Sequence, residues 1–197
     1  MKKILSILAM FAFVATAVIY AYAEDKVEVR SESNPQYEIT VYQKGEEMGK
    51  IVLELWPDVA PKHVANFDKL VTDKVYDSTA FHRVIPGFMI QGGDPNSKSG
   101  PKSTWGYGDP SYDKVPAEFS NESHNRGIVS MARSQDPNSA STQFFICVAD
   151  ASFLDGKYSV FGQVLSGMDV ADKVVNSPRD KKDNPNDKIM MIVKKIK

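Results

Sequence analysis

The stretch FHRVIPGFMIQGGD, residues 81–94, places one arginine and one glutamine among apolar side chains beside a tight glycine turn. Side chains at positions i, i+2 and i+4 of a β-strand share a face, so Phe81, Arg83 and Ile85 are expected to point in one direction. Arg83 would then lie on an apolar face, where a guanidinium stays charged and costs free energy to desolvate without a partner. The stretch therefore predicts either a small, water-poor pocket that holds one permanent positive charge or a buried salt bridge.

Short apolar or alternating runs, separated by Gly, Pro, Asn and Ser, follow one another along the chain, a pattern typical of a β-sandwich or a closed β-barrel. Alternation predicts two antiparallel strands at 37–42 and 50–55, with Gly45 and Gly49 in the connection. Helical spacing predicts a first helix over 60–74 and a second over 168–176. Further strands are expected at 80–85, 88–91, 128–132, 143–149, 159–165 and 189–196. The stretch 97–125 is expected to be an ordered surface loop, and loops of this length are usually functional.

Several runs together resemble the cyclophilin family of peptidyl-prolyl isomerases. Besides residues 81–94 they are SASTQFFIC at 139–147, LDGKYSVFG at 154–162, APKHVANF at 60–67 and GIVSMAR at 127–133. The resemblance extends from about Gln36 to the C-terminus, which makes 36–197 the expected isomerase domain. It implies a mainly β fold, an eight-stranded antiparallel closed barrel with one α-helix over each open end. It also implies peptidyl-prolyl cis-trans isomerase activity.

The N-terminal 23 residues have the pattern of a signal peptide. Lys2 and Lys3 precede an uncharged apolar stretch, and Ala21-Tyr22-Ala23 has the small residues that a signal peptidase recognises, so the mature chain is expected to begin at Glu24. The apolar stretch is nearly long enough to span a bilayer, and an uncleaved membrane anchor is the alternative. Residues 24–35 are polar and are expected to form a short linker. The run SQDPNSAS at 134–141 looks more like bacterial than eukaryotic cyclophilins, which favours a periplasmic location.

The composition limits the other functions open to the chain. A net charge of −1 gives no support for nucleic-acid binding, which usually shows a basic patch or stripe. His63, His82 and His124 are too scattered for a zinc signature, so no metal and no cofactor are expected. Cys147 is the only cysteine, and its apolar neighbours predict a buried, unreactive thiol rather than a redox or nucleophilic group.

An isomerase of X-Pro bonds needs neither a nucleophile nor a proton transfer. Resonance gives the peptide C–N bond a rotational barrier of about 18–20 kcal/mol, and uncatalysed X-Pro exchange takes tens to hundreds of seconds. A fixed donor aimed at the prolyl nitrogen would stabilise the twisted amide, and such a donor in a water-poor site contributes about 3–4 kcal/mol. A ten-thousand-fold acceleration needs roughly 5.5 kcal/mol. Arg83 is the candidate donor, and the rest would come from binding the proline ring.

The resemblance assigns roles to further residues. It implies that Gln91 hydrogen-bonds the substrate carbonyl and orients Arg83. It implies that the proline ring is bound by Phe88, Met89, Phe145 and Leu154, and the flanking peptide by Gln143, Ala132 and the backbone of Arg133. Without the resemblance, core packing would explain the four apolar residues, and a salt bridge or a core hydrogen bond would explain Arg83 and Gln91.

Two positions at the expected pocket depart from the cyclosporin-sensitive eukaryotic cyclophilins. Phe153 stands where those proteins have a tryptophan whose indole N–H binds the drug, and Tyr158 stands where a histidine is common. Both residues are still expected to line the substrate site. Phenylalanine keeps the apolar face but has no donor, so isomerase activity is expected to survive and cyclosporin binding to be weak.

Three functions compete for this chain. The leading hypothesis is an isomerase that acts as a monomer on proline-containing segments of exported proteins and assists their folding. The second is a cyclophilin-fold module that binds proline peptides with incidental turnover, which would not need the donor at Arg83. The third is a general chaperone, which would need a broad exposed apolar surface.

Overall fold

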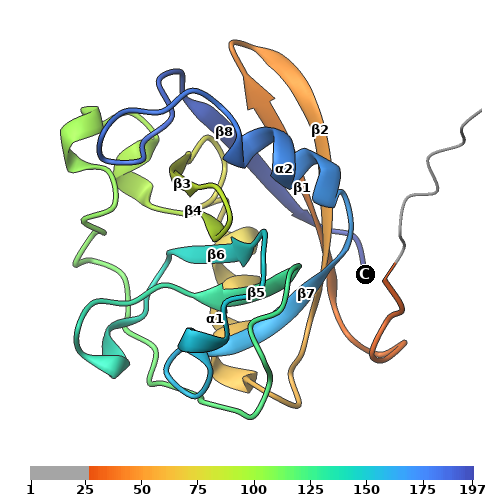
Figure 1. The fold of residues 1–197 in the computed structure, drawn as a ribbon. Coiled ribbons are helices and arrows are strands. Elements are labelled where there is room, and N and C mark those ends of the chain that lie inside the picture. Colours follow the sequence, from red (N-terminus) through yellow and green to blue (C-terminus); the bar gives the residue numbers. More distant parts are fainter. Residues whose placement is uncertain (1–26) are drawn as a thin grey trace, which may run out of the picture.

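The structure is a computed structural model that describes residues 27–197, and the predicted signal peptide lies outside this range. Eight antiparallel strands form one sheet in the order β3-β4-β6-β5-β7-β2-β1-β8, and a bridge between Ala80 and Met190 links its two edges into a nearly closed barrel (Figure 1). No helix in this part of the chain has the length and apolar character needed to cross a membrane. The strands are β1 Gln36–Gln43, β2 Glu46–Leu55, β3 Phe81–Ile85, β4 Met89–Gly92, β5 Ile128–Met131, β6 Phe144–Cys147, β7 Val160–Ser166 and β8 Ile189–Lys195.

Two α-helices pack against different parts of the barrel. Helix α1, Pro61–Thr72, starts with proline at its first turn, where no backbone N–H is needed, and contacts β7 and β8. Helix α2, Met168–Val175, contacts β2, β3 and β4. Both helices bury their apolar stripes in the main core. The expected mainly β barrel with two helices is therefore confirmed.

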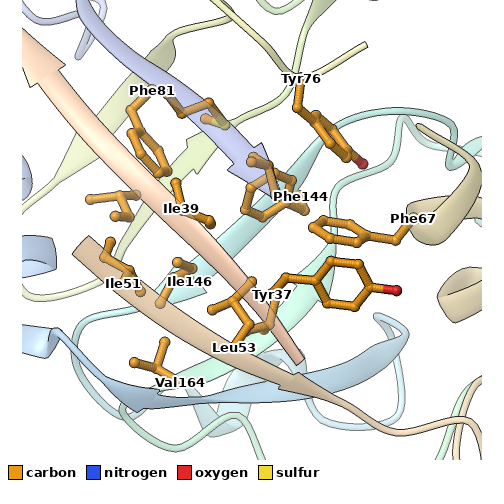
Figure 2. Close-up of a cluster of buried hydrophobic side chains, with 14 of the residues drawn as sticks. Tyr37, Ile39, Ile51, Leu53, Phe67, Tyr76, Phe81, Phe144, Ile146 and Val164 are labelled. Carbon is orange, nitrogen blue, oxygen red and sulfur yellow. The ribbon is translucent and has the colours of Figure 1, made fainter. Parts of the chain in front are cut away.

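The main core fills the barrel, and the ring of Phe67 from α1 lies among several of its aromatic rings. That ring lies 4.9 Å from the ring of Tyr76, 5.1 Å from Tyr37 and 5.5 Å from Phe144, measured between centroids (Figure 2). All four side chains are fully buried. Because sheet and helix bury their apolar faces against each other here, this cluster holds α1 to the barrel.

The strict alternation expected for β3 is wrong. The pairing of β3 with β4 shifts register between Phe81 and Arg83, as in a β-bulge. Phe81 and Val84 consequently both enter the main core, while Arg83 is exposed on the opposite side. Arg83 therefore does not share the face of Phe81, and it is not part of a buried salt bridge.

Several element ends differ from the predicted ones. Helix α1 ends at Thr72, and Lys74, two residues later, has φ +55°, which a helix does not allow. Strand β2 begins at Glu46 rather than at residue 50, so only Lys44 and Gly45 form the hairpin turn. Polar residues at an exposed hairpin end carry no hydrophobic alternation, which is why the pattern missed them.

The described part of the predicted linker is attached to the barrel. Glu54 of β2 is fully buried, and its carboxylate accepts hydrogen bonds from the backbone N–H groups of Arg30 (2.9 Å) and Ser31 (3.0 Å) and from the side chain of Asn34 (3.0 Å). The Arg30 guanidinium pairs with Asp58 at 3.1 Å. Residues 30–34 therefore make specific contacts, in addition to any spacing function of the predicted linker.

Candidate active site

Strands β3, β4 and β6 are neighbours in the sheet (Figure 1). A hollow of about 530 Å³ has residues of all three strands in its lining. Ten of the eleven residues expected at the substrate site line it. They are Arg83, Phe88, Met89, Gln91, Ala132, Arg133, Phe145, Phe153, Leu154 and Tyr158. The eleventh, Gln143, lines an adjoining hollow of about 360 Å³, which also includes Gln91, Ala132 and Arg133. The fold therefore brings the predicted residues together.

The apolar wall of the hollow is a small core of its own, separate from the main core. Met89, Phe145 and Leu154 are at least nine-tenths buried and pack with Cys147 and Ala151. These side chains pack together, as the core-packing alternative expects, and the same side chains line the hollow. That they bind a proline ring stays a prediction. Phe88 and Tyr158 are partly buried against it.

A chain of hydrogen bonds leads from Arg83 through two glutamines to the loop that contains Gly106. Arg83 Nη1 donates to Gln91 Oε1 at 3.4 Å, and Gln91 Nε2 donates to Gln143 Oε1 at 3.0 Å. Gln143 Nε2 in turn donates to the carbonyl of Gly106 at 3.1 Å. Cross-strand pairing places Arg83 opposite Gln91, and Gln91 opposite Phe145, which fixes the start of this chain. Within residues 27–197 no carboxylate pairs with Arg83, so its guanidinium can interact with a bound molecule.

Two aromatic residues form the rim of the hollow. Phe153 is 61% exposed, and its ring lies 5.3 Å from that of Phe88. Tyr158 lies 5.9 Å from Phe145 in an edge-to-face arrangement and has the guanidinium of Arg133 4.5 Å above its ring. The two positions that depart from cyclosporin-sensitive cyclophilins thus both lie at the rim.

The long loop after β4 supplies lining residues that the sequence did not single out. Trp105, Gly106 and Tyr107 line the hollow, and the ring of Tyr107 is highly exposed. The buried carboxylate of Asp94 fixes this loop by accepting a hydrogen bond from the Gly106 N–H at 2.6 Å. The loop was expected to be functional from its length, but no pattern indicated which of its residues reach the site.

His82, Lys182 and Asn184 were also missed. His82 follows the core residue Phe81, and burial lowers the pKa of its imidazole. Lys182 and Asn184 belong to a loop that is far away in the sequence and is joined to β3 by a hydrogen bond from the Val84 N–H to the Asp183 carbonyl, 2.8 Å long. Only the folded barrel brings this loop to the hollow.

An Asp-His-Ser chain, with its histidine and serine buried and its aspartate partly exposed, lies next to the pocket wall. His124 Nδ1 is 2.9 Å from Asp155 Oδ1, and His124 Nε2 is 3.1 Å from Ser130 Oγ. Ser130 is fully buried and donates to the Ser159 carbonyl, so its hydroxyl is inaccessible to a substrate and cannot serve as a nucleophile. The His124 ring instead stacks on Phe145, with centroids 6.1 Å apart, and supports the pocket wall.

The groups that could carry other chemistry are buried or dispersed. Cys147 is fully buried, as expected, and burial raises the pKa of its thiol to about 12. All three histidines are buried as well, and residues 27–197 contain no cluster of three metal-ligating side chains. The group of this site that faces the hollow with a permanent charge and a hydrogen bond to Gln91 is the guanidinium of Arg83.

Comparisons with known proteins agree with this geometry. The family model "Cyclophilin type peptidyl-prolyl cis-trans isomerase/CLD" matches residues 38–195. A probable peptidyl-prolyl cis-trans isomerase of Brucella suis is 46% identical over 178 residues, covering 88% of this chain and 86% of its own. A peptidyl-prolyl cis-trans isomerase of Acinetobacter baylyi is 41% identical and covers 71% of this chain and 73% of its own.

A solved structure extends the agreement to three dimensions. The crystal structure of a cyclophilin type peptidyl-prolyl cis-trans isomerase of Cryptosporidium parvum superposes with a TM-score of 0.71 at 29% identity, covering 83% of this chain and 98% of that one. Sequence and fold thus lead to the same family. This chain belongs to the cyclophilin-type peptidyl-prolyl cis-trans isomerases, as the residues at 81–94 and 139–147 predicted.

Proposed function

We propose that this isomerase acts on exposed X-Pro segments of exported proteins and that Arg83 is its main catalytic residue. The observation that carries the assignment is a guanidinium without a carboxylate partner in the described chain, held by Gln91 beside the apolar cluster of Phe145 and Leu154. The proline ring would lie on that cluster. As the amide twists, the prolyl nitrogen gains a lone pair, and Arg83 would donate an N–H to it.

The remaining site residues would hold the peptide while its carbonyl side turns. The amide of Gln91 has two hydrogens and uses one on Gln143, so the second is available for the substrate carbonyl. Gln143, Ala132 and the Arg133 backbone would bind the flanking peptide in the adjoining hollow. A related Cryptosporidium parvum structure was solved in the presence of the dipeptide Ala-Pro, which supports an X-Pro ligand for this fold.

The assignment of Arg83 is tested by cis–trans exchange of a short Ala-Pro peptide, measured by NMR exchange spectroscopy with the purified protein. Arg83→Ala should reduce kcat/KM at least about tenfold, since the lost donor is worth several kcal/mol. Arg83→Lys keeps the charge but loses the planar fork, and an intermediate rate is expected. Thermal unfolding of each variant shows that the fold is intact.

The outcome also separates the competing functions. No acceleration by the folded wild type would leave a proline-binding module, with assistance to folding by binding alone. An Arg83→Ala variant as active as the wild type would keep the pocket but reject Arg83 as its donor.

A monomer is expected to elute as a single species of about 20 kDa in size-exclusion chromatography.

The proposed site of action is the periplasm, which rests on the leader pattern of residues 1–23 and on the likeness of residues 134–141 to bacterial cyclophilins. If the leader is cleaved after Ala23, N-terminal sequencing of the exported protein will start at Glu24, and Ala23→Arg will block processing. If the leader remains, the isomerase domain will fractionate with the membrane. Unchanged processing of Ala23→Arg would refute the predicted site.

A further inference from the structure

The hollow of about 530 Å³, called the proline hollow below, is lined by residues whose charges do not balance. Three of them are permanent or near-permanent cations, Arg83, Arg133 and Lys182, and none is an aspartate or glutamate. The adjoining hollow, where the flanking peptide would lie, has two cations, Arg133 and Lys114, and one carboxylate, Asp109, among its lining residues. The chain as a whole has a net charge of −1, so this excess of positive charge is local. The chemistry of proline isomerisation requires one donor at the amide, which leaves the other two cations unexplained.

Carboxylates within the described residues do not neutralise these cations. Arg133 is held by backbone carbonyls, donating to Lys157 at 2.9 Å and to Ser134 at 2.9 Å, and by the face of Tyr158. The ammonium of Lys182 forms no ion pair with the described chain. The two carboxylates nearest to it in sequence pair with other cations. Asp180 accepts a hydrogen bond from the backbone N–H of Lys182 at 2.8 Å, but its ion pair is with Lys102 at 3.2 Å, and Asp183 pairs with Arg179 at 3.4 Å.

The positions of the cations relative to the floor are set by the sheet. β4 and β6 provide the floor through Met89 and Phe145, and they lie between β3 and β5 in the strand order. Arg83 belongs to β3, and the loop that contains Lys182 is hydrogen-bonded to the same strand. Arg133 follows the end of β5. A proline on the floor is therefore flanked by positive charge on both sides.

We propose that this isomerase prefers acidic peptides, X-Pro segments with glutamate or aspartate next to the proline, and that Lys182 is a specificity-determining residue. This inference deepens the proposed function and rests on it. The apolar floor binds the proline ring of any substrate, so it cannot discriminate between flanking residues. The cations beside the floor can discriminate between them, because a carboxylate on the peptide would supply the counter-charge that the protein itself does not provide.

The preference should depend on salt. Lys182 is exposed, so its interaction with a peptide carboxylate takes place near the surface and is screened by dissolved ions. Charged clefts of this kind raise association rates at low ionic strength by about tenfold or more. A preference caused by the shape of the hollow would not change with salt.

The test compares three peptides that differ only beside the proline, with glutamate, alanine or lysine on both sides. NMR exchange spectroscopy gives kcat/KM without a coupling protease, whose own specificity would distort the comparison. At low ionic strength the glutamate peptide should exceed the lysine peptide by about tenfold. The ratio should fall below about threefold in 1 M NaCl, where the Debye length is about 3 Å.

Lys182→Glu should reduce the glutamate-to-lysine ratio by at least about threefold, since it reverses the charge of the wall. Lys181→Glu makes the same change in the adjacent residue, which is exposed but does not line the hollow, and should alter the ratio by less than about twofold. Thermal unfolding confirms that both variants are folded.

Two results would overturn the preference. One is equal turnover of the glutamate and lysine peptides at low salt, and the other is a ratio that Lys182→Glu and Lys181→Glu change equally. The alanine peptide distinguishes a failure of the charge preference from a failure of the proposed function. If it too is not isomerised by the folded wild type, the enzyme assignment fails; if it is isomerised while the charged peptides do not differ, only the charge preference fails.

Discussion

At the scale of single residues, the site depends on one irregularity in β3. The register shift between Phe81 and Arg83 lets Phe81 and Val84 both enter the core and turns Arg83 to the pocket side. In a regular strand, two residues three positions apart would face opposite sides. The bulge therefore allows β3 to contribute two core side chains and still present Arg83 beside Gln91.

Gln91 is expected to act through Arg83 as well as on the substrate. Gln91→Leu keeps the approximate volume of the side chain but removes the acceptor of Arg83 Nη1 and the donor to Gln143. We expect kcat/KM for an Ala-Pro peptide to fall about fivefold, the equivalent of one net hydrogen bond of about 1 kcal/mol.

A positioning role for Gln91 predicts that the effects of Gln91→Leu and Arg83→Ala are not additive. When Arg83 is already replaced by alanine, Gln91→Leu should lower kcat/KM by a smaller factor than it does when Arg83 is present. Fully additive losses in a double-mutant cycle would show that Gln91 acts on the substrate alone.

Phe153 predicts how the site responds to cyclosporin. Its ring is 61% exposed at the rim and has no hydrogen-bond donor. Phe153→Trp adds an indole N–H, and we expect cyclosporin to bind about five- to tenfold more tightly, as one added hydrogen bond of about 1 kcal/mol implies. Isothermal titration calorimetry measures the change, and Phe119→Trp, at another exposed phenylalanine, should leave the affinity unaltered.

At the scale of elements, a buried carboxylate of β2 holds the segment before β1, which is also joined to β2 by a hydrogen bond from the Leu55 N–H to the Pro35 carbonyl. Glu54 accepts hydrogen bonds from Arg30, Ser31 and Asn34, and also from Trp56 Nε1 at 3.3 Å and Gln163 Nε2 at 2.9 Å. Burial opposes ionisation of this group. The hydrogen bonds from the backbone of Arg30 and Ser31 outweigh it, and the pKa of Glu54 is lowered.

Glu54→Gln should destabilise the fold by about 2–3 kcal/mol at pH 7, because an amide cannot accept all five hydrogen bonds and leaves buried donors unsatisfied. Chemical denaturation measures the loss. Glu46→Gln, at an exposed glutamate of the same strand, should change the stability by less than about 0.5 kcal/mol.

The pH dependence of this stability has a definite sign. A carboxyl group whose pKa is lowered on folding stabilises the native state above its unfolded pKa, and the contribution is lost as the pH falls through the folded pKa. The difference between wild type and Glu54→Gln should therefore be largest near neutral pH and shrink below about pH 4. A difference that stays constant down to pH 3 would show that the charge of Glu54 is not what holds the segment.

At the scale of the whole molecule, the main core and the cluster under the hollow are separate, and a third, small cluster contains Trp56, Ile128 and Val160. The main core fills the barrel around Phe67, and the smaller cluster of Met89, Phe145 and Leu154 lies beneath the hollow. Phe67→Ala should cost about 3–5 kcal/mol, because it opens a cavity between α1 and the sheet. Phe119→Ala, which removes a partly exposed ring, should cost less than about 1 kcal/mol by the same thermal or chemical denaturation.

Local sequence patterns and the family resemblance predicted most of the barrel and ten of the residues in the hollow. Alternation and helical spacing are direct consequences of which side chains are buried, so β1, β7, β8 and both helices were found within a few residues of their observed ends. The alternation of β3 failed because a bulge leaves no mark in the order of apolar and polar residues.

The chain's sequence by itself determined the family, the barrel and two of the charged residues at the hollow, Arg83 and Arg133, because these depend on local periodicity and on short motifs. Only the tertiary structure decided on which side of β3 Arg83 lies, that Glu54 holds the N-terminal segment, and that Lys182 lines the same hollow. Each of these depends on contacts between residues far apart in the chain, such as the hydrogen bond of Val84 to Asp183, which form when the closed barrel brings distant loops together.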